Sequence, residues 1–204
     1  YLHVSTDRRT WQPVESPELD ALSVESLAVV DGDVLALGTD RTDDTVRALR
    51  VTPDGVATTF GLDVPEEATG VAGVAVAGED MVVLLTEAAP AGDDRLTVPR
   101  SRDAGGSWTR GFIPGAGPRV AGVMPVEGGF VATGTTRRDV PAGPGTIATA
   151  WRTTGDDDRW TVTRTDDNGS QTASTGFGAP APYLDGYAAV LWLGSDRQAG
   201  LSID

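Results

Sequence analysis

The sequence predicts an all-β fold, a β-propeller made of four-stranded antiparallel blades. Three observations predict it. Short apolar runs are bounded by Gly, Asp and Pro, no stretch of ten or more residues keeps a helical period with caps, and a pattern recurs about every 50 residues. A period near 50 suits a four-stranded blade, whereas most helical repeat units are shorter. The 204 residues therefore correspond to about four repeat units.

Two landmarks recur with this period. The first is an apolar run, a turn and a second apolar run, with turn glycines at Gly32, Gly78, Gly128 and Gly186. The second is an aromatic residue after a polar turn, at Trp11, Phe60, Trp108 and Trp160. Because the two landmarks are independent, their shared period indicates a true repeat. We treat residues 1–204 as one propeller domain or partial propeller, with approximate units 1–22, 23–66, 67–114, 115–168 and 169–204.

Each complete unit accommodates four strands in chain order. Innermost strands are expected at 27–30, 71–77 and 120–126. Second strands are expected at 34–38, 81–86, 130–134 and 187–193. Third strands are expected at 46–51, 95–100 and 146–152, with further ones at 2–5 and 201–203. Fourth strands are expected at 56–60, 107–112 and 160–164. Since the second strands are apolar at nearly every residue, we expect both of their faces to be covered.

An eight-residue motif separates the third and fourth strands of unit 67–114. Residues 101–108 read Ser-Arg-Asp-Ala-Gly-Gly-Ser-Trp and match Ser/Thr-x-Asp-x-Gly-x-Ser/Thr-Trp without a mismatch. A short Asp side chain accepts hydrogen bonds from turn amides, Gly supplies a positive φ, and Trp buries a large area over the turn. We expect a structural role for Ser101, Asp103, Gly105, Ser107 and Trp108.

Degenerate copies of the motif occur at the same phase of the repeat. Residues 5–11 keep Ser5, Asp7 and Trp11, but they are one residue short and lack the glycine. Residues 153–160 keep the distance from the first Thr to Trp160, but the third position of the motif is not an Asp. Residues 52–55 keep only an Asp-Gly turn. The motif resembles the Asp box, or BNR repeat, of sialidase-like propellers. This resemblance implies turns on the blade periphery, away from the central funnel, and so a structural role.

The same resemblance indicates which catalytic residues to seek. Sialidases of this fold bind a carboxylate with three arginines and use a Tyr–Glu nucleophile pair with an Asp acid/base. The first arginine commonly lies in Phe/Tyr-Arg-Ile-Pro, but residues 112–114 read Phe-Ile-Pro. The tyrosines are Tyr1, which is terminal, and Tyr183 and Tyr187, which fall around an inner hairpin where core packing is expected. We therefore predict no catalytic residue in this segment.

Composition excludes other classes of function. A formal net charge of −14 opposes binding to nucleic acids, and the absence of Cys excludes thiol catalysis, disulfides and Cys-zinc sites. The only histidine, His3, lies in a terminal strand, which argues against a Ser-His-Asp triad. Residues 166–170 have part of the spacing of a calcium loop, but Phe177 replaces the closing acid. We predict no metal and no cofactor, and calcium titration with thermal melting decides the calcium question.

The leading interpretation is a non-catalytic Asp-box propeller module of a secreted or surface-anchored bacterial protein. Its loops would bind a protein or glycan ligand, and we expect an extracellular or cell-surface location. The alternative is a glycoside hydrolase of the exo-sialidase type, with catalytic residues partly outside this segment; an intracellular scaffold is a weaker third hypothesis. No apolar stretch reaches the about 20 residues of a membrane span, so no membrane insertion is predicted. The acidic, Lys-free composition fits a GC-rich genome or salt adaptation.

Both ends of the chain fall in a predicted third strand. The segment can therefore close as a four-bladed ring or form an arc of a larger propeller, whose remaining blades would then be its partners. We favour the arc, since sialidase-like rings usually have six or more blades. An isolated arc exposes the apolar faces of its end blades, so we expect it to associate or aggregate.

Overall fold

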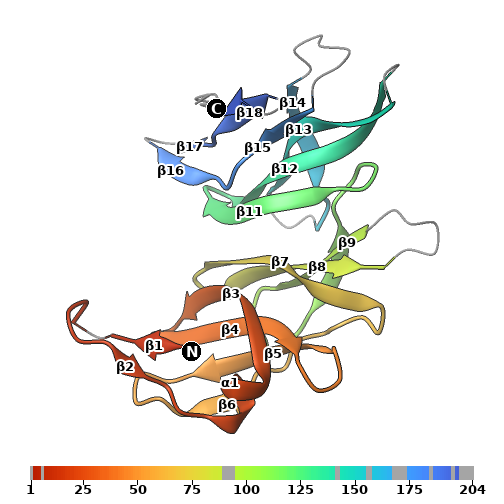
Figure 1. The fold of residues 1–204 in the computed structure, drawn as a ribbon. Coiled ribbons are helices and arrows are strands. Elements are labelled where there is room, and N and C mark those ends of the chain that lie inside the picture. Colours follow the sequence, from red (N-terminus) through yellow and green to blue (C-terminus); the bar gives the residue numbers. More distant parts are fainter. Residues whose placement is uncertain are drawn as a thin grey trace. The chain divides into compact units, whose positions relative to one another are not determined.

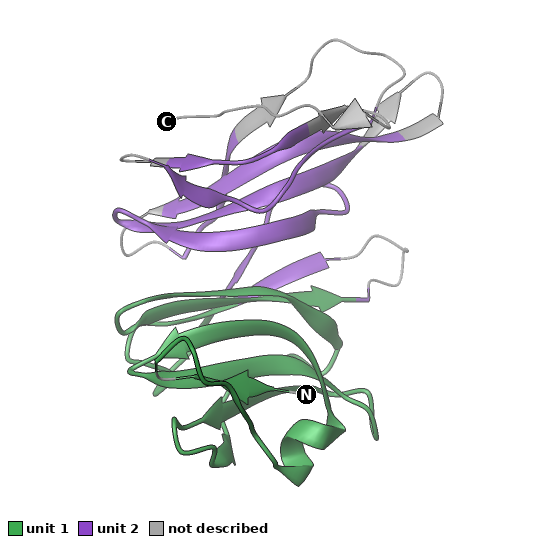
Figure 2. Cartoon of the chain, turned by 60° about the vertical axis from the view of Figure 1, so that its left-hand side comes forward, with its two compact units in different colours: residues 1–87, 99–109 green, residues 88–98, 110–204 purple. Residues whose placement is uncertain are grey.

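The computed structural model describes residues 2–5, 7–88, 95–140, 143–154, 158–166, 174–183, 186–193 and 196–197. The chain divides into two compact units, residues 1–87 with 99–109 and residues 88–98 with 110–204 (Figure 2). Nearly all the regular structure is β-strand, and neighbouring strands pair antiparallel in the sheets of both units. The predicted all-β class with four-stranded antiparallel sheets is therefore confirmed.

The N-terminal segment forms a short hairpin and one turn of helix. Strand β1 (His3–Val4) pairs antiparallel with β2 (Gln12–Pro13), and helix α1 (Pro17–Ala21) follows. Proline is tolerated in the first turn of a helix, where its missing amide would have no partner. Two acidic residues of α1, Glu18 and Asp20, lie near the N-terminus, where the helix dipole favours negative charge.

The first four-stranded sheet follows the chain order without crossovers (Figure 1). Its strands are β3 (Leu22–Val30), β4 (Asp33–Asp40), β5 (Val46–Val51) and β6 (Ala57–Thr59). The turn between β3 and β4 consists of Asp31 and Gly32, whose φ angles are 52° and 88°. Positive φ at both positions is what a tight two-residue hairpin requires.

Two further sheets repeat this order (Figure 1). The second contains β7 (Ala68–Ala77), β8 (Asp80–Glu87), β9 (Arg95–Ser101) and β10 (Thr109–Phe112). The third contains β11 (Arg119–Val126), β12 (Gly129–Val140), β13 (Gly143–Thr154) and β14 (Thr161–Asp166). Each strand again pairs with the next along the chain.

The C-terminal segment forms a nested hairpin. Strand β15 (Thr175–Phe177) pairs with β18 (Leu191–Leu193), and β16 (Ala181–Tyr183) pairs with β17 (Gly186–Ala188). A two-residue strand, β19 (Asp196–Arg197), pairs with β18. The strand predicted at 201–203 lies outside the described residues.

The second strands of the first three sheets are buried, as predicted from their apolar runs, whereas the prediction of a single second strand at 187–193 is wrong: this segment is divided between β17 and β18, and Val190 is 49% exposed. In β8, five consecutive side chains from Met81 to Leu85 have no exposed surface. Leu35, Ala36 and Leu37 in β4 are at most 1% exposed, as are the three residues from Phe130 to Ala132 in β12. Burial at consecutive residues means that both faces of these strands are covered.

Two of the first strands, β3 and β7, begin three or more residues earlier than predicted, and both contain β-bulges near the predicted start. The register of β3 shifts between Val24 and Ser26, and β7 shifts between Ala68 and Gly70 and again between Val71 and Gly73. A bulge inserts one residue and breaks the two-residue alternation from which strands are read in a sequence. The predicted starts at 27 and 71 fall near these bulges, so the residues before them were left out.

Each compact unit has its own core. In the first unit, Val30, Leu35 and Leu37 of the β3–β6 sheet pack against Val83 and Leu85 of β8. The opposite face of the β3–β6 sheet buries Ala36, Leu49 and Val51 against Val14 and Leu19 of the N-terminal segment. In the second unit, Ala148 and Ala150 of β13 pack against Phe177 and Ala189. Consecutive sheets within a unit are thus joined face to face.

Candidate functional site

The 101–108 motif forms a turn in which Asp103 is the central hydrogen-bond acceptor. Its Oδ1 accepts bonds from the Ser101 hydroxyl at 2.8 Å and the Ser107 amide at 2.8 Å, and its Oδ2 accepts the Ser107 hydroxyl at 2.7 Å. The Gly105 amide donates to Ser101 Oγ at 2.8 Å. The Ser107 hydroxyl and amide, together with Ser101, lower the pKa of Asp103 to about 2.

Trp108 and Gly105 attach this turn to residues that follow β6. Trp108 Nε1 donates to the Gly61 carbonyl at 2.9 Å, and its ring meets Phe60 edge-on with centroids 6.3 Å apart. Gly105 has a φ of +94°, and a Cβ there would lie 2.3 Å from Phe60 Cζ. Both the backbone angle and the ring beneath it therefore require glycine at 105.

The shorter 5–11 motif builds nearly the same turn. Asp7 Oδ1 accepts the Ser5 hydroxyl at 3.1 Å and the amides of Arg9 and Thr10 at 2.8 and 2.7 Å, and its Oδ2 accepts the Thr10 hydroxyl at 3.0 Å. The Thr10 and Arg9 amides are the main reason that the pKa of Asp7 falls to about 2. The one-residue deletion therefore leaves the carboxylate-centred network in place.

A third turn, residues 52–55, keeps part of this network. The Thr52 hydroxyl bonds to the Asp54 carboxylate, and the Val56 amide donates to Thr52 Oγ1 at 3.2 Å. In all three turns the residue after the Asp has a positive φ: 60° at Arg8, 86° at Gly55 and 54° at Ala104. The common core is thus Ser/Thr-x-Asp followed by a left-handed residue, a spacing that was readable in the sequence.

The tryptophans of the repeat differ in burial. Trp160 is 6% exposed, although residues 155–157 of its turn lie outside the described residues. Trp11 is 62% exposed, so the expectation that the motif tryptophan buries a large area is wrong at this position. Trp108 of the complete motif is partly covered because it lies against Phe60 and Gly61. Among the described residues, no such pair of neighbours covers the Trp11 ring.

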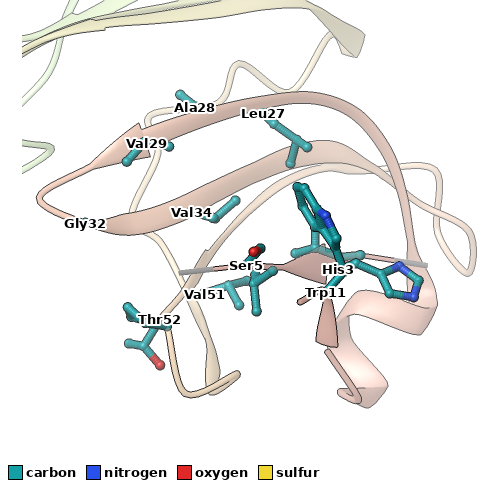
Figure 3. A pocket seen from close by; sticks show the side chains of 13 residues that line it. His3, Ser5, Trp11, Leu27, Ala28, Val29, Gly32, Val34, Val51 and Thr52 are labelled. Atoms are coloured by element: carbon teal, nitrogen blue, oxygen red, sulfur yellow. The ribbon is translucent and has the colours of Figure 1, made fainter. Parts of the chain in front are cut away.

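The exposed Trp11 borders a groove of about 490 Å³ in the first unit. Its wall is mostly apolar and is formed by β1, β3, the start of β4 and the turn after β5. Figure 3 shows the Trp11 indole standing toward β3, where Leu27 and Val29 project, while the His3 imidazole points away. A second hollow, of about 570 Å³, lies between β3 and the N-terminal segment, and Leu2 and Leu27 line both hollows.

Arginines form ion pairs at repeated positions that the sequence reasoning missed. Arg50 Nε lies 2.5 Å from Asp33, and Arg100 Nη2 lies 2.6 Å from Asp80. In both cases a third-strand arginine pairs with the first residue of the second strand, and Arg152 at the equivalent place in β13 donates to the Glu127 carbonyl at 3.0 Å. The spacing of Arg50, Arg100 and Arg152 is the signal that could have revealed them.

The remaining sequence candidates lie apart from one another. Ile113 of the Phe-Ile-Pro stretch is buried, Tyr187 is buried, and Tyr183 is 40% exposed. Across the described residues, His and acidic side chains form no group of three or more that could hold a metal ion. Most of the 166–170 segment considered for calcium lies outside the described part of the chain. Within that part, no helix has the length and apolarity needed to span a membrane.

Comparison with protein families and with curated proteins identifies no relative. No protein-family model matches the chain, and no curated protein matches it. The class that the structure itself defines is an all-β protein of four-stranded antiparallel sheets.

Proposed function

We propose that this chain is part of an Asp-box β-propeller of the sialidase-like type and acts as a non-catalytic module. In this proposal its loops bind a protein or glycan ligand in a secreted or surface-anchored bacterial protein. Three sheets with sequential strand order, one per repeat of about 50 residues, support the propeller architecture. The face-to-face packing of consecutive sheets within each unit also supports it.

The hydrogen bonding of Asp103 carries the non-catalytic part of the proposal. Its Oδ1 accepts bonds from Ser101 and Ser107 of the same turn, and its Oδ2 accepts one from Ser107. The carboxylate of Asp7 is bonded in the same way by Ser5, Arg9 and Thr10 of its own turn. A carboxyl group with a pKa of about 2 is a poor general acid or base near neutral pH. The conspicuous acids of the motifs therefore serve the turns.

The other acids support the same conclusion. In the described part of the chain, every carboxyl group with a clearly displaced pKa has it lowered, and in each case the main cause is a hydrogen bond from a neighbour in the sequence. Hydroxyls two residues away donate these bonds, from Ser16 to Glu18, from Thr42 to Asp40 and from Thr45 to Asp43. These acids, like those of the motifs, therefore serve the local structure of their own segments.

Turnover of fluorogenic glycosides tests the non-catalytic assignment. The full-length protein that carries this segment is incubated with methylumbelliferyl sialoside, galactoside and glucoside, and release of the fluorophore is followed. We expect no release above that of a heat-denatured sample. Release by the native full-length protein would contradict the assignment and favour the glycosidase.

Binding to an array of defined sialylated and neutral glycans tests the ligand. We expect one glycan class to be retained and recovered uncleaved. Retention with cleavage would again indicate a hydrolase, and retention of no glycan would contradict the glycan form of the proposal and leave a protein ligand.

A further inference from the structure

The third strand of each four-stranded sheet carries an arginine near its end, and the partner of this arginine differs between the sheets. Arg50 Nε lies 2.5 Å from Asp33 Oδ2. Arg100 bonds to Asp80 through Nε at 2.9 Å and through Nη2 at 2.6 Å. Asp33 and Asp80 are each the first residue of the second strand of their sheet. A carboxylate against the Nε side of the guanidinium is therefore part of the repeat in the first two sheets.

The third sheet keeps the arginine and lacks the acid. Arg152 of β13 lies opposite Val131 of β12. Arg50 has the same register in the first sheet, where it lies opposite Leu35 of β4. The first residue of β12, two positions before Val131, is Gly129. Because Gly129 does not have a positive φ, the backbone does not require glycine at this position, and its presence there removes only a side chain.

As a result, the guanidinium of Arg152 has a buried donor without an acceptor. Its Nη2 donates to the Glu127 carbonyl at 3.0 Å. Its Nε is the one buried side-chain nitrogen or oxygen atom of the described residues that has no hydrogen-bond partner. Within the same residues, no carboxylate forms an ion pair with this guanidinium. Since an unpaired buried donor is costly, above all on a charged group, an acceptor supplied to Nε would be stabilising.

We propose that Arg152 is a binding site for a carboxylate supplied from outside the chain, which takes the place of the Asp33 and Asp80 side chains of the other sheets. Arginine presents its Nε and Nη donors as a planar fork that matches a carboxylate. Arg100 and Asp80 show this arrangement within the same chain. The carboxylate belongs to a small organic acid or to an Asp or Glu side chain of a protein ligand. The inference goes beyond the proposed function and does not depend on it.

The chain itself contains acids that compete with an external carboxylate. Glu127 contacts the arginine through its backbone carbonyl, and the residue is exposed. Asp156 and Asp157 follow Arg152 closely in the sequence and lie outside the described residues. Replacing each acid with its amide distinguishes these sources from an external one, because the amide keeps the size of the side chain and removes its charge.

Titration of the full chain with sodium acetate, followed by the NMR signals of the arginine Nε–H groups, tests the proposal. The ionic strength is held constant with sodium chloride, so that screening does not change during the titration. The signal missing from Arg152→Lys identifies the group of interest. We expect this signal to move and to saturate, while the signals of Arg50 and Arg100 stay in place because Asp33 and Asp80 already bond to them.

A second titration distinguishes the two sources of the carboxylate. The probe is the tripeptide Ala-Asp-Ala with both ends blocked, so that its only carboxylate is the Asp side chain. Binding of this peptide about tenfold or more tighter than acetate would support a protein ligand. Equal affinity for the peptide and acetate would support a small organic acid.

Gly129→Asp supplies the missing carboxylate from within the chain. We expect the Arg152 Nε–H signal of this variant to be displaced before any acetate is added, and its affinity for acetate to be at least about tenfold weaker. Gly129→Ala is the matched control, since it adds a side chain without a carboxylate, and it should respond like the wild type. Unchanged signals of Arg50 and Arg100 show that each variant remains folded.

Three results would overturn the proposal. The first is an Arg152 signal that moves with neither acetate nor the peptide, as expected if water alone bonds to Nε. The second is a Gly129→Asp variant that binds acetate like the wild type. The third is a displacement of the signal, without any ligand, in Glu127→Gln or in the double variant Asp156→Asn with Asp157→Asn, as large as the displacement that acetate causes. A carboxylate of the chain itself would then hold the arginine.

Discussion

Replacing Gly105 with alanine should destabilise the first unit through two separable effects. The first is backbone strain, because φ is +94° at this residue and the left-handed region costs alanine about 1–2 kcal/mol. The second is steric, because the new methyl group would lie 2.3 Å from Phe60 Cζ. Moving that ring disturbs its edge-on contact with Trp108, and overpacking of this kind costs about 1–3 kcal/mol. The expected loss of unfolding free energy is therefore about 2–5 kcal/mol.

Gly55 provides a matched control for the strain alone. Its φ is +86°, and a Cβ at this position would meet nothing within 4 Å. Gly55→Ala should cost only about 1–2 kcal/mol. The difference between the two variants isolates the contact with Phe60. Urea unfolding followed by far-UV circular dichroism measures both.

A double-mutant cycle with Phe60→Leu assigns the steric part. Leucine lacks the ring atoms Cε and Cζ that the methyl group would strike, so Gly105→Ala should cost about as much in this background as Gly55→Ala costs in the wild type. The coupling energy should be about 1–3 kcal/mol. Equal losses for Gly105→Ala and Gly55→Ala in the wild type, or a coupling near zero, would refute the reasoning.

Three further predictions concern polar contacts of the first unit. The folded-state pKa of Asp103 is about 2, below its ordinary 3.8, so the hydrogen bonds of its carboxylate stabilise the fold above about pH 4 and are lost as the pH falls toward 2. In Asp103→Asn, the melting temperature should therefore fall less between about pH 4 and pH 2 than it does in the wild type. Trp108→Phe removes the hydrogen bond to Gly61 and should cost about 1 kcal/mol in urea unfolding, and an unchanged midpoint would contradict it. Asp80→Asn removes the ion pair with Arg100, whose side chain is 5% exposed, and should cost about 1.5–3 kcal/mol in urea unfolding. A loss below about 0.5 kcal/mol, the scale of an exposed ion pair, would contradict this prediction.

The sequence located the strands well where they alternate or run apolar, and poorly where the backbone departs from that pattern. The second strands β4 and β8 were found within two residues of their ends, because a long apolar run needs no knowledge of neighbours. The start of β3 was missed because its bulge shifts the alternation. The length of β12 was missed because its distal half is rich in Thr and Arg and is held by pairing with β13.

The motif residues illustrate the same division. The sequence identified Ser101, Asp103 and Ser107, because a hydroxyl and a carboxylate two to four residues apart readily bond to each other within a turn. It did not show that the 5–11 turn, despite its missing residue, keeps an equivalent network around Asp7. Nor did it distinguish the half-buried Trp108 from the exposed Trp11, since that depends on which other residues lie against each ring.

By itself the sequence determined the all-β class, the repeat and the local chemistry of its turns, because these depend on side-chain periodicity and on contacts within a few residues. Only the tertiary structure decided which apolar surfaces are covered. Leu27 and Val74 occupy equivalent places in the repeat and are similarly apolar, yet one is 51% exposed and the other 8%. Burial depends on what packs against a strand from elsewhere in the chain, and residue type alone does not carry that information.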